Sequence, residues 1–343
     1  MYSGFALTLL KWFEEYGREL PWRDTRDPYA IWLSEIILQQ TRVQQGWAYW
    51  ERFMQRWPTV DQLAAASEDD VLRLWQGLGY YSRARNLHTA ARQIVQMGAF
   101  PRTFDQLRQL KGVGDYTAAA IASMAFDQPT AVVDGNVYRV LARHFGIHTP
   151  INSHEGKEEF ALLAQQLLPE DEAATYNQAI MDFGAIQCTP HSPKCIVCPL
   201  QESCSALRSG MVEQLPVKLQ KVNVKERRLV YIYIRCNGQT AIRRRGEGDI
   251  WQGLWEPVLV EEGESVTHFV QTMFQDTSSM PSLKLLKSGF RHVLTHRILY
   301  CDFYLLQSET KPVLPNGYRW IDESELDKYA LPRMVELLLQ ALC

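Results

Sequence analysis

The sequence predicts a multidomain chain in which an all-α domain with a cysteine-rich metal loop is followed by an α+β domain. From residue 1 to about residue 207, apolar side chains recur with a helical period, and no alternating strand pattern occurs. Four cysteines then fall within residues 188–204. Beyond them the apolar residues alternate, as in "RLVYIYIRCNGQTAIRRR", which is typical of strands.

The composition is that of an ordinary soluble globular protein. The 343 residues are 46% hydrophobic and 22% charged, which suits two domains. A net charge of −3 gives no bulk sign of nucleic-acid binding, so such a site must come from local clustering. No stretch has the apolar length of a membrane span or signal peptide. Seven cysteines, an odd number, without a secretion signal indicate a reducing, cytoplasmic setting.

The first clear helix boundary is at Asp27 and Pro28. Aspartate caps a helix well, and proline suits the first helical position. We expect this helix to continue through residues 31–41 and on toward Trp57, which precedes Pro58. Further helices are expected from about residues 68, 83, 104, 116, 137, 157 and 175.

Within this helix, "IWLSEIILQQT" places one carboxylate, Glu35, in an apolar run. Its helical neighbours are Ile31, Trp32 and Leu38, so the carboxyl should face the interior. Burial raises the pKa of a glutamate above its reference of about 4.3. Glu35 is therefore a candidate general acid that holds a proton near neutral pH.

A glycine turn in "LKGVGDYTAAAI" predicts a helical hairpin. One helix should end before Gly112, and a second, alanine-rich helix should follow Gly114 with Asp115 as its cap. The glycines allow close approach of another chain, and amides at the second helix start suit a phosphate. An ordinary helical hairpin is an equally common explanation of this motif.

A second carboxylate, Asp134, stands in "AVVDGNVYRV" directly before a predicted helix. A structural N-cap explains it as well as a functional role does. The two roles are compatible, because a capping aspartate can also present an oxygen to a pocket.

The cysteine loop "CTPHSPKCIVCPLQESC" has the spacing C-x6-C-x2-C-x5-C. Four thiolates in one short loop can surround one metal centre, and four unrelated buried cysteines would rarely fall so close together. Zinc sites usually combine two separated knuckles, whereas one compact loop suits an iron–sulfur cubane. The spacing alone thus favours iron–sulfur over zinc. It predicts four ligands, Cys188, Cys195, Cys198 and Cys204.

The C-terminal part begins after a polar stretch that reads as a linker. Asn237-Gly238 is placed as a hairpin turn between two strands. Between residues 218 and 245 stand nine lysines or arginines and one acidic residue, Glu226. This basic run suits a strip along DNA, and a solvated face explains it nearly as well.

Together these motifs resemble the helix-hairpin-helix DNA glycosylases that carry an iron–sulfur loop, and within them the adenine DNA glycosylase (MutY) family. The likeness covers nearly the whole chain, because "LPWRDTRDPYAIWLSEIILQQTRV", "GLGYYSRARNL", "LKGVGDYTAAAI", "VVDGNVYRV" and the cysteine loop occur in family order. It implies a helix-hairpin-helix glycosylase domain over residues 1–207 with a [4Fe–4S] cluster on the 188–204 loop. A linker, 208–225, and a Nudix-like 8-oxoguanine recognition domain, 226–343, would follow.

The resemblance implies base excision repair, in which adenine mispaired with 8-oxoguanine or guanine is flipped out of double-stranded DNA and removed. Glu35 would protonate adenine at N7 and later help activate water. Asp134 would stay ionised and stabilise the sugar cation, with a covalent sugar adduct as the family's variant of this step. Tyr116 and Asn136 match supporting positions. We expect a monomer that binds DNA and does not associate with a membrane.

Tyr116 also predicts the type of glycosylase. The relatives that cut the DNA strand carry at this position a lysine that forms a Schiff base, and a tyrosine cannot do so. The chain should therefore be a monofunctional glycosylase without efficient lyase activity.

The resemblance further assigns DNA-facing positions, with Tyr80 as a wedge at the mispair. Without it, the residues favour a structural explanation, with Trp22 and Tyr80 as core aromatics and Gln40 as a surface amide. The assigned residues are Trp22, Arg23, Gln40, Thr41, Tyr80, Lys111, Gly112, Val113, Gly114, Gln178, Thr295 and His296.

The C-terminal domain lacks the Nudix box, so it should not hydrolyse nucleotides, because the carboxylates that hold magnesium are missing. Where the family usually has Phe-Ser-His to contact 8-oxoguanine, this chain has Leu294-Thr295-His296. The hydroxyl and the histidine are kept, and the stacking ring is lost.

Two rival functions remain from the sequence. One is a glycosylase of the same superfamily for another base, such as thymine opposite guanine. The other is a catalytically silent lesion-binding protein. The C-terminal domain argues against the first, and the retention of both Glu35 and Asp134 argues against the second.

Overall fold

The computed structural model describes residues 3–219, 224–261, 263–274 and 281–342. The chain divides into two compact units, one of residues 1–65 and 86–220 and the other of 66–85 and 221–343. Segment 66–85 groups with the C-terminal half, which no pattern in the linear sequence indicates. The domain limits expected at residues 207 and 226 stay predictions, and residues 220–223 of the expected linker lie outside the described residues.

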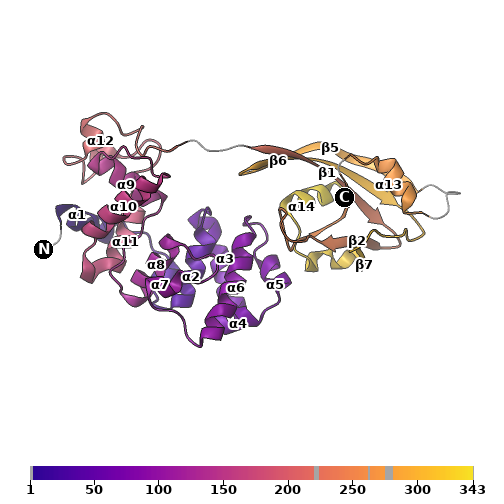
Figure 1. Cartoon of the computed structure of the whole chain (residues 1–343), viewed down its shortest axis with the longest axis horizontal. Coiled ribbons are helices and arrows are strands. Elements are labelled where there is room, and N and C mark those ends of the chain that lie inside the picture. The colour runs from indigo at the N-terminus through magenta and orange to yellow at the C-terminus, as the bar shows by residue number, and fades with distance from the viewer. Residues whose placement is uncertain (1–2, 220–223, 262, 275–280, 343) are drawn as a thin grey trace. The chain divides into compact units, whose positions relative to one another are not determined.

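The first unit is helical, as predicted (Figure 1). Its α-helices are α1 (Gly4–Tyr16), α2 (Pro28–Leu38), α3 (Val43–Arg56), α4 (Val60–Ala65), α7 (Phe104–Leu107), α8 (Asp115–Phe126), α9 (Gly135–Phe145), α10 (His154–Leu167), α11 (Ala173–Asp182) and α12 (Ser205–Arg208). Short helical turns are η1 (Pro21–Arg23), η2 (Glu170–Glu172), η3 (Phe183–Gln187, π-helical) and η4 (Cys195–Val197). The helix starts expected from the sequence lie within a few residues of those observed.

Helix α8 is the centre of this unit. All its residues from 117 to 124 are buried, and α2 and α11 pack against it. Alanines at positions 118–120 keep its surface small, so the neighbouring helices approach closely. Helix α2 is buried from residue 29 to 37, with Glu35 among these residues. The packing of α2 on α8 therefore brings a carboxylate into the core.

Helix α2 ends earlier than the sequence predicted. It stops at Leu38, and α3 begins only at Val43. Gln40 adopts a φ of 55°, which breaks the helix. Gln40 and Thr41 consequently lie in a turn after the helix of Glu35 rather than on it. Helix α2 is buried on nearly all sides, whereas α3 buries only Gly46 and Phe53, so the two segments need separate axes.

The expected cap of α8 is also wrong by one residue. Gly114 is the N-cap, with extended backbone, and Asp115 is the first helical residue. The Asp115 carboxylate instead pairs with Arg108 at 2.5 Å. Gly112 is needed at φ 78°, and a Cβ there would meet the Asn86 side chain at 2.7 Å. The glycines therefore form the tight turn, and no side chain caps the start of α8.

The second unit is α+β, as predicted. It contains α5 (Glu68–Leu74), the start of α6 (Ser82–Met97), and two sheets. One sheet has the order β4-β1-β6-β5 and the other β3-β2-β7. The strands are β1 (Lys225–Arg235), β2 (Gln239–Arg244), β3 (Trp255–Glu256), β4 (Val258–Val260), β5 (Ser282–Leu294), β6 (Arg297–Gln307) and β7 (Arg319–Asp322). The helical segments are α13 (Val266–Thr272), η5 (Glu323–Lys328), α14 (Arg333–Leu339) and η6 (Gln340–Leu342).

The predicted turn at Asn237-Gly238 is confirmed. Both residues have positive φ, 49° and 76°, as a type I′ turn requires. Only the bridge between Cys236 and Gln239 joins the two strands at the turn, because β1 and β2 then continue into different sheets.

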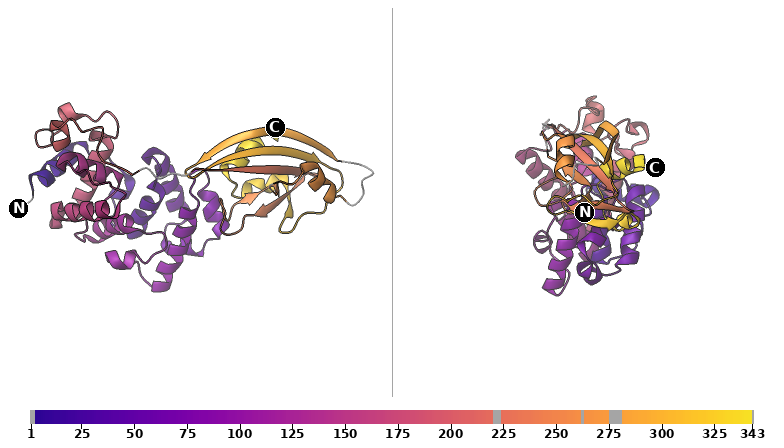
Figure 2. Two further views of the ribbon diagram at one scale, coloured as in Figure 1. Left: turned by 45° about the horizontal axis from the view of Figure 1, so that its top comes forward. Right: turned by 90° about the vertical axis from the view of Figure 1, so that its right-hand side faces the viewer.

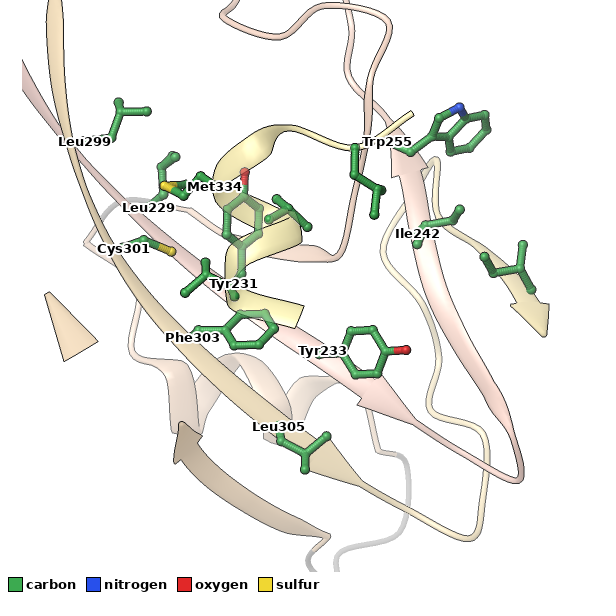
Figure 3. Close-up of a cluster of buried hydrophobic side chains, with 14 residues drawn as sticks. Leu229, Tyr231, Tyr233, Ile242, Trp255, Leu299, Cys301, Phe303, Leu305 and Met334 are labelled. Atoms are coloured by element: carbon green, nitrogen blue, oxygen red, sulfur yellow. The ribbon is translucent and has the colours of Figure 1, made fainter. Parts of the chain in front are cut away.

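One buried cluster of this unit lies between the long strands and α14, and a second contains residues of β1, β4 and α13. Strands β1, β6 and β5 run alongside one another (Figure 2). In the parallel pair β1 and β6, alternate residues share a face, for example Tyr231 opposite Phe303. Met334 of α14 joins them in the buried cluster (Figure 3). Across the described parts of both units, no helix has the length and apolarity needed to cross a membrane.

The arginines of the basic run are paired within their own unit, and the role of this run along DNA stays a prediction. Six of its arginines are paired with carboxylates of the same unit, because strand pairing and segment 66–85 bring acidic residues beside them. The pairs are Arg227–Asp249, Arg228–Asp302, Arg235–Glu323, Arg243–Glu256, Arg244–Glu68 and Arg245–Glu256. Lys221 of this run lies outside the described residues.

Candidate active site

The helical unit contains a cavity of about 830 Å³ between α2, α8, α9 and α11. Most of the site residues predicted for this unit line it. They are Trp22, Arg23, Glu35, Gln40, Thr41, Gly112, Gly114, Tyr116, Asp134, Asn136 and Gln178. Lys111 and Val113 belong to the same hairpin and do not line the cavity. Lys111 is exposed, and the Val113 side chain is buried.

Glu35 is the buried acid of this cavity, with 7% of its surface exposed. Burial raises its pKa to about 7, and the nearby negative charge of Asp134 adds to the rise. The hydrogen-bonding hydroxyl of Tyr116 and the positive charge of Arg23 oppose it. A carboxyl with this pKa is populated in both protonation states near neutral pH, which is what a general acid needs.

Asp134 is both a helix cap and a wall of the cavity. Its Oδ1 accepts hydrogen bonds from the backbone N–H groups of Asn136 and Val137, each at 2.8 Å. Its Oδ2 accepts a third, from Asn136 Nδ2 at 2.7 Å. Burial raises the pKa of Asp134, whereas these donors and the charge of Arg139 favour the ionised form.

Tyr116 reaches the cavity from the first turn of α8. Its hydroxyl donates to Met181 Sδ at 3.4 Å, and burial raises the pKa of Tyr116 well above its usual value. The hydroxyl therefore keeps its proton and can serve as a donor to the Glu35 carboxylate.

A chain of hydrogen bonds runs from Asp134 to the cysteine loop. Asn136, bonded to Asp134, accepts from Arg139 Nη2 at 2.8 Å, and Arg139 Nε donates to the backbone oxygen of Cys188 at 2.7 Å. The absence of a side chain at Gly184 allows η3 to approach Asn136 closely, because a Cβ on Gly184 would lie 2.6 Å from the Asn136 Cβ. The carboxylate and the first cysteine are thus held by the same helix, α9.

The four cysteines of the loop line one small cavity of about 30 Å³. Buried Arg143 donates to Cys188 Sγ at 3.4 Å and to the backbone oxygen of Thr189 at 2.7 Å. In the described ranges no group of ligand side chains is close enough for a single metal ion. In a cubane each cysteine sulfur binds a different iron, so its four ligands need not converge on one point.

In the second unit, the predicted wedge and the predicted lesion-reading residue are hydrogen-bonded to each other. The hydroxyls of Tyr80 and Thr295 lie 2.6 Å apart. Tyr80 is 49% exposed and has a φ of 47°, which is uncommon for a bulky residue. Thr295 and His296 form the exposed turn between β5 and β6.

The sequence interpretation missed two residues that line the cavity, Arg18 and Met181, and the buried Asp182 that bonds Arg18. Met181 and Asp182 follow Gln178 at helical spacings of three and four residues on α11. That spacing places them beside Gln178. The helical spacing from Gln178 is therefore a sequence signal for Met181 and Asp182, whereas no local signal marks Arg18.

Comparisons with known proteins identify both units. Residues 33–168 match the family model described as HhH-GPD superfamily base excision DNA repair protein, and residues 230–341 match a NUDIX domain. The adenine DNA glycosylase of Mus musculus is 45% identical over 384 residues, covering 94% of this chain and 75% of its own. That of Buchnera aphidicola subsp. Schizaphis graminum is 35% identical and covers 73% of each chain. A solved thermostable thymine-DNA glycosylase is 31% identical with a TM-score of 0.56, covering 60% of this chain and 95% of its own.

Proposed function

Since the chain belongs to the adenine DNA glycosylase family, we propose that it removes adenine paired with 8-oxoguanine or guanine and leaves an abasic site. The observation that carries the proposal is a cavity whose lining brings together the two buried carboxyl groups of Glu35 and Asp134, the first with a pKa of about 7. Two carboxyl groups in different environments are the pattern used to cleave sugar bonds.

Glu35 acts first, as the acid. The target adenine leaves the duplex and enters the cavity between Trp22, Arg23 and Gln178, which requires the base to unstack. The proton on Glu35 moves to N7 of adenine as the bond between the base and C1′ breaks, and the electron pair of that bond leaves with the base. Glu35, now ionised, accepts a proton from the water that attacks C1′.

Asp134 stabilises the positive charge that develops on the sugar. An ionised carboxylate in a water-poor cavity interacts strongly with such a cation. Its three N–H donors support the ionised form against the effect of burial. In the family's variant of this step, Asp134 forms a covalent bond to C1′ as the base leaves, and water then breaks that bond.

The reaction stops at the abasic site because no amine attacks the sugar. Tyr116 occupies the hairpin position that is lysine in the strand-cutting relatives, and its hydroxyl cannot form a Schiff base. Tyr116 instead stabilises the carboxylate of Glu35 after proton transfer.

The four loop cysteines would hold a [4Fe–4S] cluster. The bound cluster would supply rigid ligation that closes the loop, rather than chemistry on the base. Arg143 ties this loop to α9 through Cys188 and Thr189, so the loop and the cap residue Asp134 share one helix.

The second unit reads the base opposite adenine. Thr295 presents a hydroxyl at the tip of the β5–β6 turn, and His296 follows it. The unit lacks the carboxylates of a Nudix hydrolase, so we assign it recognition without nucleotide hydrolysis.

One assay tests this function against its rivals. The purified protein is incubated with duplexes that carry adenine opposite 8-oxoguanine, adenine opposite guanine, or thymine opposite guanine, and is then treated with alkali. Strand breaks at adenine in the first two duplexes are expected. Breaks only at thymine would identify a glycosylase for thymine mispairs, and binding without breaks would identify a silent lesion-binding protein.

A further inference from the structure

Asp182 is a fully buried carboxylate bonded to two arginines that line the cavity of Glu35. It is the last residue of α11, one turn after Gln178, and its side chain has no exposed surface. It accepts hydrogen bonds from the backbone N–H and the guanidinium of Arg18 and from both terminal nitrogens of Arg23. The bonds from Arg23 Nη1 and Nη2 measure 2.9 and 2.8 Å. A buried charge needs such pairing, because an unpaired one is expensive.

Both arginines line the cavity that holds Glu35. The Arg23 side chain is 13% exposed and that of Arg18 is 31% exposed. Arg23 Nη1 also donates to the backbone oxygen of Arg18 at 2.7 Å. The guanidinium of Arg23 is therefore held by Asp182 and Arg18 and lies over the Phe13 ring, while the residue lines the cavity.

We propose that Asp182 is a positioning residue that fixes Arg23 in the cavity wall and balances its charge, so that Glu35 keeps its proton for the departing base. This inference rests on the proposed role of Glu35 as the acid. Without Asp182, two like charges would remain at the same wall. They would favour the ionised carboxyl across the cavity.

The charges around the cavity change the pKa of Glu35 in the direction that this role requires. The charge of Arg23 lowers the pKa of Glu35, and the pairing with Asp182 offsets part of that charge. Burial would raise the pKa of Asp182, but the hydrogen bonds from Arg23 and Arg18 hold it below its usual value, so Asp182 stays charged at neutral pH. Other charged or titratable groups also face the cavity, namely Arg42, Asp115, Tyr116 and Asp134.

The test is the pH dependence of adenine excision under single-turnover conditions, with the active fraction measured by titration with a duplex that carries a non-hydrolysable adenine analogue. For Asp182→Asn we expect the alkaline limb of the rate profile to move down by about one pH unit. The rate per active enzyme at pH 8 should fall about tenfold, and the rate near pH 5.5 should change much less.

Two further variants establish that Asp182 acts through Arg23. Arg23→Gln should move the alkaline limb upward, because a charge that favours ionised Glu35 is lost. Adding Asp182→Asn to Arg23→Gln should produce a smaller downward movement than in the wild-type background, because only the charge of Arg18 is then left unbalanced. A downward movement in the double variant equal to that in the single one would overturn the inference. So would an unmoved limb in Arg23→Gln, even if Asp182→Asn does not fold.

Glu256→Gln is the matched control for loss of a buried carboxylate. Glu256 is fully buried in the second unit and is bonded to Arg243 at 2.9 Å and Tyr231 at 2.8 Å. It should lower thermal stability without moving the limb. If Asp182→Asn behaves like this control, its role is merely structural and the inference is wrong. If instead Glu35→Gln excises adenine normally, the proposed function fails first, so the two failures are distinguishable.

Discussion

The Tyr80 and Thr295 hydroxyls are within hydrogen-bonding distance, 2.6 Å, although 215 positions separate them in the chain. One residue precedes α6 and the other forms the β5–β6 turn. If both face the mispair, as the family resemblance predicts, each fixes the orientation of the other. An exposed hydroxyl pair of this kind contributes at most about 1 kcal/mol to stability, so its main effect should be on positioning.

We therefore expect Thr295→Val to reduce the preference for adenine opposite 8-oxoguanine over adenine opposite guanine several-fold. Valine keeps the shape of threonine and removes the hydroxyl. Tyr80→Phe should have a smaller effect, and the double variant should be less impaired than the sum of the two. Relative excision rates on the two duplexes measure this. Strictly additive effects would show that the bond plays no part in recognition.

Glu35→Gln should lower the excision rate by about two to four orders of magnitude while binding to mispaired DNA persists, because the glutamine amide cannot donate a proton to adenine. Gel-shift affinity and single-turnover rates on the same duplex check this. Near-native turnover would exclude Glu35 as the acid.

Stability should also depend on Glu35. Its pKa rises from 4.5 to about 7 on folding, so its neutral form is favoured in the folded state. The resulting stability is fully present below pH 4.5 and is lost as pH rises through about 7. The free energy of unfolding should thus decrease over this window by up to roughly 3 kcal/mol. Denaturant unfolding of Glu35→Gln should lack this component, and an identical pH dependence in both proteins would contradict it.

Tyr116→Phe should move the alkaline limb of the excision profile to higher pH. The tyrosine hydroxyl lowers the pKa of Glu35, so its removal should raise that pKa further.

Wild-type protein treated with borohydride on its substrate should give no trapped adduct, because the cavity wall has no amine at the Tyr116 position. Efficient trapping would show a lyase mechanism.

Gly184→Ala should impair folding and excision together. A Cβ at this position would lie 2.6 Å from the Asn136 Cβ and 3.0 Å from its backbone oxygen, so η3 or α9 must move. A loss of about 1–3 kcal/mol is expected, as for other overpacked sites. Gly135→Ala is the control, since nothing lies within 4 Å of a Cβ there. Equal melting temperatures for the two variants would contradict the close contact.

Cys204→Ser should lower the iron and acid-labile sulfide bound per chain, because one of four thiolates is lost. Cys236→Ala is the control, since Cys236 is buried in the second unit and is not part of the loop. Iron analysis of both proteins after purification without oxygen provides the measurement. Full iron content in Cys204→Ser would remove it from the ligand set.

Local patterns in the chain were enough to predict the two-part fold, the helix starts, the Asn237-Gly238 turn and the buried setting of Glu35. These features depend on neighbours within a few residues, and periodicity, capping and turn preferences report such neighbours directly. Even so, the end of α2 at Leu38 and the cap of α8 at Gly114 differed from expectation, because packing overrides weak local preferences.

Other features arise only when distant segments meet in space. Asp182 stands 164 positions from Arg18, and their ion pair has no trace in either local sequence. Likewise no pattern in the basic run indicates that folding brings carboxylates such as Glu68 and Glu256 beside its arginines. Electrostatic energies depend on distance and burial in three dimensions, so charge balance around the cavity belongs to the assembled core and not to any short stretch of sequence.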